Sequence, residues 1–170
     1  MIELLILYKL SGKVLTMYGI SKDIHEEFSV LTTPSFGTIK PALTRLEKNG
    51  YVKGQKTMSS GGRPSIYYSI TKDGVEELRR LMTSPLQENP IQFLTTARIR
   101  LSCAEVLDKN MQLEMFKLLK NKAESIVIDT KNKVANNKLG FYSEMVFDNL
   151  ICECKNLISL VEGFERACKN

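Results

Sequence analysis

The sequence predicts a mainly α-helical protein with one small β-hairpin, built as a compact N-terminal module followed by a helical C-terminal half. Three observations predict this organisation. Apolar residues recur at helical spacing over most of the chain. A glycine-rich turn followed by a β-branched and aromatic stretch interrupts that pattern near residue 60. The last part of the chain repeats apolar residues at alternating spacings of three and four, as in helices that pack along each other.

Two helices are predicted before residue 30. Residues 2–10 carry leucines on one stripe, which predicts a short buried helix. A second helix is predicted from about Ser21, which can cap it, to Phe28, which repeats Ile24 at four residues. Pro34 then predicts a loop, because the residue before a proline disfavours helical geometry.

A third helix is predicted over residues 35–49. We expect it to begin between residues 35 and 38, since Pro41 is tolerated only near a helix start, and Gly50 stands just past its end. The face predicted to be buried comprises Ile39, Ala42, Leu43 and Leu46. The opposite face is basic and able to form hydrogen bonds, as a helix in a DNA major groove requires, and comprises Thr38, Lys40, Thr44, Arg45 and Lys48.

A hairpin and a fourth helix complete the N-terminal module. Residues 51–57 and 66–70 are predicted strands around a glycine-rich turn, and Thr71 can cap a helix that follows. Three helices, a hairpin and a closing helix make a winged helix-turn-helix module. Pro85 and Pro90 mark the boundary, so the sequence predicts a DNA-binding domain over residues 1–84 and an α-helical dimerisation domain over 85–170.

The C-terminal domain is predicted to contain a helix near residues 91–101, a restart at the capping box of residues 102–105, and two long helices. In the last helix an unbroken heptad stripe predicts pairing with a second copy of the chain. The alternative is that this stripe packs only on residues 116–130 of the same chain. The predicted dimerisation residues are Phe147, Leu150, Cys154, Leu157, Val161 and Phe164.

Composition and charge restrict the function. A hydrophobic content of 43% is enough for a core, and the start of the chain suits neither a secretory leader nor a membrane span, so we expect a cytoplasmic protein. The net charge is +5, but residues 38–72 alone carry +6, with seven basic residues and one acid. A basic stretch within a balanced chain indicates a surface that faces a polyanion.

Metal and catalytic sites are not expected. The four cysteines form no CxxC pair and the chain has one histidine, so neither a zinc site nor a disulfide framework is predicted. His25 stands beside two glutamates on a predicted helix surface, without a nucleophile motif. We therefore expect no enzyme activity and no cofactor.

Two motifs support a more specific resemblance. Residues 35–50 follow the pattern S-x-G-T-I-x-P-A-L-x-R-L-E-x-x-G, and residues 61–74 follow G-G-R-P-x-x-Y-Y-x-I-T-x-x-G. Over roughly residues 4–82 the chain resembles the PadR family of transcriptional regulators, and beyond residue 90 it is similar to the longer subfamily with an extended helical dimerisation domain. Two positions depart from the family pattern: Lys40 stands where many members have tyrosine, and Met17 where they have glycine.

The resemblance and the charge pattern together imply a sequence-specific regulator, expected to be a repressor that binds a dyad operator as a homodimer. The helix over residues 35–48 would enter the major groove and the glycine-rich wing tip the neighbouring minor groove. Beyond the outward face of that helix, the expected contacts with double-stranded DNA are Ser35, Lys53, Lys56, Gly62, Arg63 and Tyr67.

Two alternatives stay open at this point. A winged helix can also present a basic surface to an acidic protein partner without binding DNA. A small-molecule effector could bind among Phe93, Phe116, Phe141 and Phe147, although these aromatic residues could equally be ordinary core.

Overall fold

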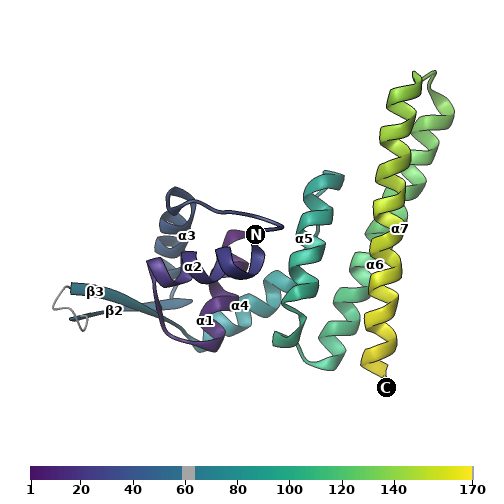
Figure 1. Ribbon diagram of the computed structural model, residues 1–170. Coiled ribbons are helices and arrows are strands. Elements are labelled where there is room, and N and C mark those ends of the chain that lie inside the picture. Colours follow the sequence, from purple (N-terminus) through teal and green to yellow (C-terminus); the bar gives the residue numbers. More distant parts are fainter. Residues whose placement is uncertain (59–63, 170) are drawn as a thin grey trace. The chain divides into compact units, whose positions relative to one another are not determined.

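The computed structural model of the protein describes residues 1–58 and 64–169, and its helices and strands form two compact units (Figure 1). The first unit contains Met1–Ser84 together with Arg98–Val106. The second contains Pro85–Ala97 and the chain from Leu107 onward. The segment Arg98–Val106, which the sequence interpretation placed in the C-terminal domain, therefore groups with the N-terminal module.

The first unit is a winged helix-turn-helix, as predicted. Its elements are α1 (Ile2–Gly12), β1 (Leu15–Thr16), α2 (Met17–Phe28), α3 (Phe36–Lys48), β2 (Val52–Met58), β3 (Pro64–Ile70) and α4 (Lys72–Thr83). The three strands form an antiparallel sheet in the order β1-β3-β2. Helix α1 packs against α2, α3 and α4, and this explains why its apolar residues Leu4, Leu5, Ile6, Leu7 and Leu10 are all buried.

Helix α2 begins four residues earlier than the sequence predicted. Thr16, not Ser21, is the N-cap, and its side chain accepts a hydrogen bond of 3.1 Å from the Gly19 amide. The strand β1 was also not predicted; it pairs Leu15 and Thr16 with Tyr68 and Tyr67 of β3. The sequence interpretation missed the strand because two residues are too few to show a periodic pattern. It missed the cap because a threonine directly after a strand resembles part of a turn.

The connection from α3 through the hairpin to α4 depends on the glycines that end the two sequence motifs, Gly50 and Gly74. Gly50 has φ of +77°, the left-handed conformation expected just past a helix end. Thr71 caps α4, as predicted, by accepting a 3.0 Å bond from the Gly74 amide. A Cβ atom on Gly74 would lie 2.0 Å from the Tyr51 carbonyl oxygen, so only glycine allows α4 to approach the base of the hairpin this closely.

The second unit is a helical hairpin with one further helix. Helix α5 (Pro90–Ser102) begins in this unit, and after the 3-10 turn Ala104–Val106 the long helices α6 (Lys109–Asn136) and α7 (Phe141–Lys169) follow. They run antiparallel and pack along each other (Figure 1). The predicted capping box at residues 102–105 does not start the long helix; Asp108 caps it by accepting a 3.0 Å bond from the Met111 amide.

The heptad stripe of α7 packs mainly inside one chain. Cys154, Leu157 and Val161 have exposed fractions of 0–3% in the isolated chain, and the Phe164 ring stacks on Phe116 of α6 at 6.0 Å. The predicted assignment of the whole stripe to a dimer interface is therefore wrong for the three buried residues, because α6 already covers them. Phe147 and Leu150 are half-buried, and Phe164 is 41% exposed.

Candidate nucleic-acid interface

Helix α3 presents a polar face to solvent and an apolar face to the core. Ile39, Ala42, Leu43 and Leu46 are at most 2% exposed, which confirms the predicted buried stripe. The side chains predicted to contact DNA are exposed, and they comprise Ser35, Thr38, Lys40, Thr44, Arg45 and Lys48. The buried stripe fixes the rotation of the helix about its own axis. These six residues therefore face solvent whichever rotamers their side chains adopt.

Several polar side chains on this face are held by bonds within the unit. The hydroxyls of Ser35 and Thr38 lie 3.3 Å apart at the start of α3, and Thr44 donates a 3.0 Å bond to the Lys40 carbonyl one turn earlier. Arg45 donates a 2.9 Å bond from Nε to the Glu3 carboxylate of α1. Lys40 has no ion pair within the residues that the structure describes, so it is the less restrained of the two cations.

Strand pairing separates the predicted contacts of the wing. Side chains alternate along a strand, so Lys56 points to the same face of the hairpin as Val52. The Val52 side chain is buried against the core. Lys56 pairs with Ile66, and this face of the hairpin is turned toward α3. Lys53 and Tyr67 have the opposite parity, so the structure does not bring them together with Lys56.

A groove of about 390 Å³ lies between α3, the start of α2 and β3. Lys40 and Thr44 line it from α3, and Ile66 and Tyr68 line it from β3. Met17, one of the two positions that depart from the family pattern, lines it from α2. The groove therefore joins the outward face of α3 to the hairpin as one continuous surface.

The base of the hairpin is fixed to α3 by one carboxylate. The Gly54 amide donates a 3.1 Å bond to Glu47, and a Cβ atom at Gly54 would lie 2.6 Å from the same oxygen. Tyr68 lies opposite Gly54 on the neighbouring strand, where burial and then the charge of Glu47 raise the pKa of its hydroxyl. The angle between hairpin and helix thus depends on Glu47 and on the absence of a side chain at Gly54.

An exposed aromatic pair beside α3 was missed by the sequence interpretation. The Tyr18 ring, 69% exposed, stacks on the exposed Phe36 ring with centroids 6.4 Å apart and planes 16° apart. Tyr18 also lines the groove. The signal was present in the sequence, since two aromatic residues fall outside the predicted buried stripes, but only the fold brings α2 and α3 together.

Two predicted contacts cannot be placed. Gly62 and Arg63, at the tip of the wing, lie outside the described residues. Pro64, the first residue of β3, is exposed. The structure therefore describes the wing up to Met58 and from Pro64 onward.

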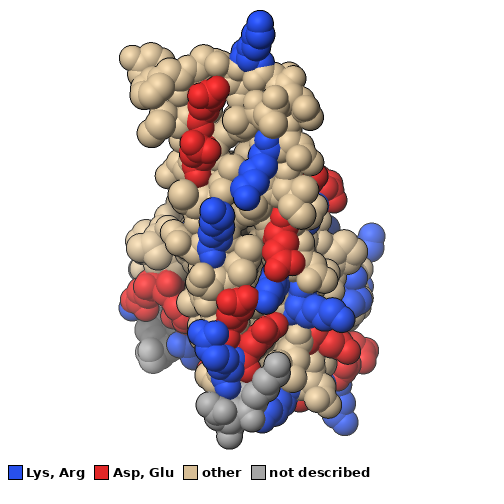
Figure 2. Space-filling view, turned by 90° about the vertical axis from the view of Figure 1, so that its right-hand side faces the viewer, with Lys and Arg blue, Asp and Glu red and all other residues tan. Residues whose placement is uncertain are grey.

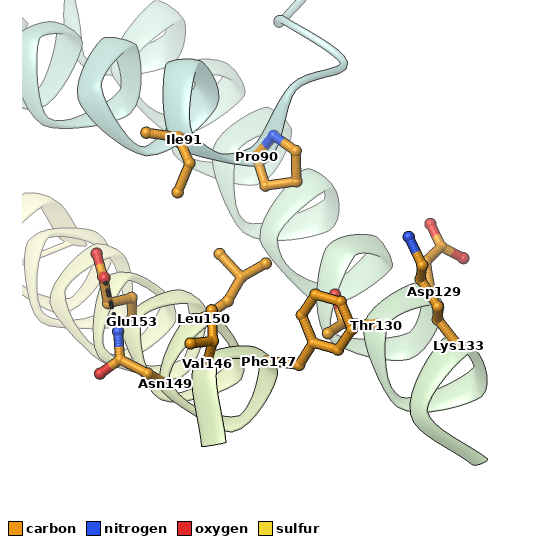
Figure 3. Close-up of a pocket in the computed structure, with 10 residues that line it drawn as sticks. All are labelled: Pro90, Ile91, Asp129, Thr130, Lys133, Val146, Phe147, Asn149, Leu150 and Glu153. Carbon is orange, nitrogen blue, oxygen red and sulfur yellow. Dashed lines mark hydrogen bonds between the residues drawn. The ribbon is translucent and has the colours of Figure 1, made fainter. Parts of the chain in front are cut away.

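The four phenylalanines predicted as an effector site do not form one. Phe93 and Phe116 belong to the core, with exposed fractions of 0% and 2%, whereas Phe141 is 70% exposed. Phe147 lines a hollow of about 450 Å³ in the second unit, between the start of α5 and the α6–α7 hairpin (Figure 3), and the other three do not line this hollow. The aromatic residues are scattered because they occupy different faces of three helices.

The described part of the chain contains neither a metal-binding cluster nor a membrane-spanning helix. Within it, no group of three or more His, Cys, Asp or Glu side chains is placed to hold a metal ion. No helix there is long and apolar enough to cross a bilayer.

Comparison with known proteins gives a consistent family. The model of the transcriptional regulator PadR-like family matches residues 6–80. A PadR-like transcriptional regulator from Bacillus cereus is 32% identical, with 46% of this chain and 74% of that chain covered and a TM-score of 0.41. A PadR family transcription regulator from Clostridium difficile is 33% identical, with 45% and 78% covered and a TM-score of 0.39.

Another solved structure aligns over nearly the whole chain. It is Bacillus subtilis PadR in complex with operator DNA, with 20% identity, 98% of both chains covered and a TM-score of 0.47. Comparison with the curated proteins gives no match.

Proposed function

Because the chain belongs to the PadR-like family of transcriptional regulators, we propose that it is a cytoplasmic, sequence-specific repressor that binds a dyad operator as a homodimer. In this proposal residues 1–84 form the DNA-binding domain, completed by Arg98–Val106, and the helices beyond them form the dimer. A two-fold pair of α3 helices about 34 Å apart would match successive major grooves on one side of the duplex.

The observation that carries this proposal is the exposed polar face of α3 beside the groove. Lys40 and Thr44 stand where a recognition helix approaches base edges, and Ser35 and Thr38 stand at the helix start where phosphates are commonly bound. Lys48, Lys53 and Lys56 supply phosphate contacts around it, with Lys56 on the side of the groove and Lys53 outside it.

Four further expected contacts are proposed for different parts of the DNA. Arg45 reaches DNA only if it leaves or shares Glu3. Tyr67 is assigned to the outer face of the wing, as a contact with the phosphate backbone. Gly62 and Arg63 are proposed for the minor groove because a guanidinium suits the negative potential of a narrow groove.

The test is selection of bound fragments from genomic DNA, followed by fluorescence anisotropy on the selected duplex at several salt concentrations. We expect log affinity to fall with log salt by roughly 0.9 for each neutralised phosphate. Lys40→Ala should weaken binding by about tenfold or more, consistent with roughly 1–3 kcal/mol for a base contact. Lys117→Ala, on the exposed surface of α6, is the matched control and should bind like the wild type.

The same measurement separates this proposal from the alternative of an acidic protein partner. If the wild-type chain shows no affinity for duplex DNA at low salt, the DNA-binding function is wrong and the basic surface serves another polyanion. A small-molecule effector remains part of the proposal without an assigned site, since the four phenylalanines do not provide one.

A further inference from the structure

Helix α3 begins with an exposed aromatic residue on the row of side chains proposed to face DNA. Phe36 is the first residue of α3, and Lys40 and Thr44 follow it at intervals of four. Residues four apart on a helix lie on the same face, one turn from each other. The Phe36 ring therefore continues the row of Lys40 and Thr44 toward the helix start, where the residues of a recognition helix contact base edges.

The Phe36 ring is not part of the core of the first unit. Its exposed fraction is 46%, whereas the buried stripe of α3 is at most 2% exposed. The ring stacks on Tyr18 of α2, with centroids 6.4 Å apart and planes 16° apart, and Tyr18 is itself 69% exposed. A contact between two helices of one unit thus holds the pair in place, while a large part of both rings stays in water.

The groove beside the aromatic pair is largely apolar and carries one positive charge. Tyr18 lines this groove of about 390 Å³ together with Met17, Leu43 and Ile66. Among the described residues that line it, Lys40 is the only charged one. The pair therefore borders a surface on which no described acidic side chain would repel a phosphate.

The charge of the wider region indicates what the exposed rings meet. Residues 38–72 carry a net charge of +6, whereas Figure 2 shows basic and acidic side chains intermingled over the face that it draws. A basic region attracts the phosphates of DNA, and phosphate contacts position a protein on the duplex without reading its sequence. The uncharged rings within this region are then left for the bases. Among the groups that bases present in the major groove, the C5-methyl group of thymine is the apolar one.

We propose that Phe36 reads a thymine in each half of the operator through that methyl group, and that Tyr18 is the positioning residue that holds the ring. The proposal rests on the DNA-binding function proposed above and adds the base that is read and the side chain that reads it. Cytosine presents an amino group and no methyl group in the major groove, so the contact favours thymine. Stacking on Tyr18 fixes the Phe36 side chain before DNA binds, which lowers the entropy lost on binding.

Deoxyuridine tests the contact, because it lacks only the C5-methyl group of thymidine. Each thymine of the duplex selected from genomic DNA is replaced in turn, and the affinity of the full chain is measured by fluorescence anisotropy. The wild type should lose about fourfold at one thymine of each half-site, as the burial of one methyl group implies. Replacing both thymines should cost about 15-fold, since effects at separate positions of a site are roughly additive. Phe36→Ala should bind the thymine and uracil duplexes equally well.

Three further variants separate reading of the methyl group from a general loss of binding. Lys40→Ala should weaken binding to both duplexes by the same factor and so keep the fourfold ratio. Tyr18→Ala should lower the ratio, whereas Tyr18→Phe keeps the stacked ring and should preserve it. Because each ratio compares two duplexes with one protein sample, partial unfolding of a variant does not change it.

The outcomes distinguish this proposal from the function on which it rests. Duplex binding by the wild type without loss at any deoxyuridine, or an unchanged ratio in Phe36→Ala, overturns the reading of thymine and leaves the DNA-binding function standing. A wild-type ratio in Tyr18→Ala overturns the positioning role of Tyr18. A wild-type chain without affinity for any duplex at low salt removes the function and the thymine contact together.

Discussion

Gly74 is the position of the winged module at which we expect a larger residue to be tolerated least. Its position at the start of α4 brings the backbone within contact of the Tyr51 carbonyl, which in turn accepts a 3.0 Å bond from the Thr71 amide. Thr71 closes the same corner through a 2.7 Å bond from its hydroxyl to the Gly50 carbonyl. The corner between hairpin and α4 is therefore made from backbone groups in direct contact.

Gly74→Ala should accordingly destabilise the protein by at least about 2 kcal/mol, since overpacking at a site that cannot relax costs roughly 1–3 kcal/mol or more. Thermal unfolding followed by circular dichroism measures the loss. Gly12→Ala is the control, because a Cβ atom there meets nothing within 4 Å, and its melting temperature should match or exceed that of the wild type. Equal melting temperatures for the two variants would show that the corner between the hairpin and α4 can shift to accommodate the added Cβ atom.

Cys103 makes the stability of the first unit depend on pH in the alkaline range. The thiol is fully buried, and this burial raises its pKa to about 12, from an ordinary value of about 8.5. Between these values the unfolded chain loses the thiol proton while the folded chain keeps it. The folded state then binds more protons, so the free energy of unfolding falls as pH rises, by up to about 1.4 kcal/mol per pH unit.

Urea unfolding at pH 8.5, 9.25 and 10 tests this dependence. We expect Cys103→Ala to lose the part of the slope that the buried thiol causes, whatever its stability at pH 8.5. Cys152→Ala changes an exposed thiol and should keep the wild-type slope. A slope unchanged in Cys103→Ala would mean that another buried group dominates.

At the level of the elements, periodicity predicted which helices exist and which faces they bury, but not their partners. The stripe of α3 was predicted correctly because Ile39, Ala42, Leu43 and Leu46 repeat at helical spacing and the module has one core. The stripe of α7 is equally regular, yet a heptad pattern is the same whether its partner is α6 or a second chain. Only the fold shows that Cys154, Leu157 and Val161 already have a neighbour.

The candidate site was predictable to a similar extent. Motif and charge predicted the exposed residues of α3, since they lie on one helix. The division of the wing between Lys56 on one face and Lys53 and Tyr67 on the other depends on strand register, which the composition of the turn does not determine. The pairing of Tyr18 with Phe36 depends on the packing of two helices and leaves no local pattern.

Leu157 tests the assignment of the first stripe of α7 to α6. Because its side chain is buried in the isolated chain, Leu157→Ala should cost about 2–5 kcal/mol of unfolding free energy at any protein concentration. Ser159→Ala, two residues further along on an exposed position, should change stability by less than about 0.5 kcal/mol. If the effect of Leu157→Ala disappeared on raising the protein concentration, the residue would instead belong to the dimer contact.

For the molecule as a whole, the boundary between the units decides which fragments can fold. Pro85 and Pro90 suggested a division after residue 84, but the chain returns to the first unit at Arg98–Val106. Two contacts explain this return. The buried Arg100 donates bonds of 2.9 Å to the Ser84 carbonyl and hydroxyl at the end of α4, and Tyr8 of α1 donates a 3.0 Å bond to Glu105.

A fragment of residues 1–106 should therefore unfold cooperatively, with a melting temperature at least about 5 °C above that of a fragment of residues 1–84. Without Arg100 and Glu105, the end of α4 loses its hydrogen-bond donors and α1 loses the acceptor for Tyr8, and about 1 kcal/mol shifts the melting temperature of so small a domain by roughly 4–8 °C. Arg100→Met in the longer fragment isolates the contribution of the guanidinium. If the two fragments had the same melting temperature, Arg98–Val106 would not stabilise the first unit. The winged module would then end before Pro85 and Pro90.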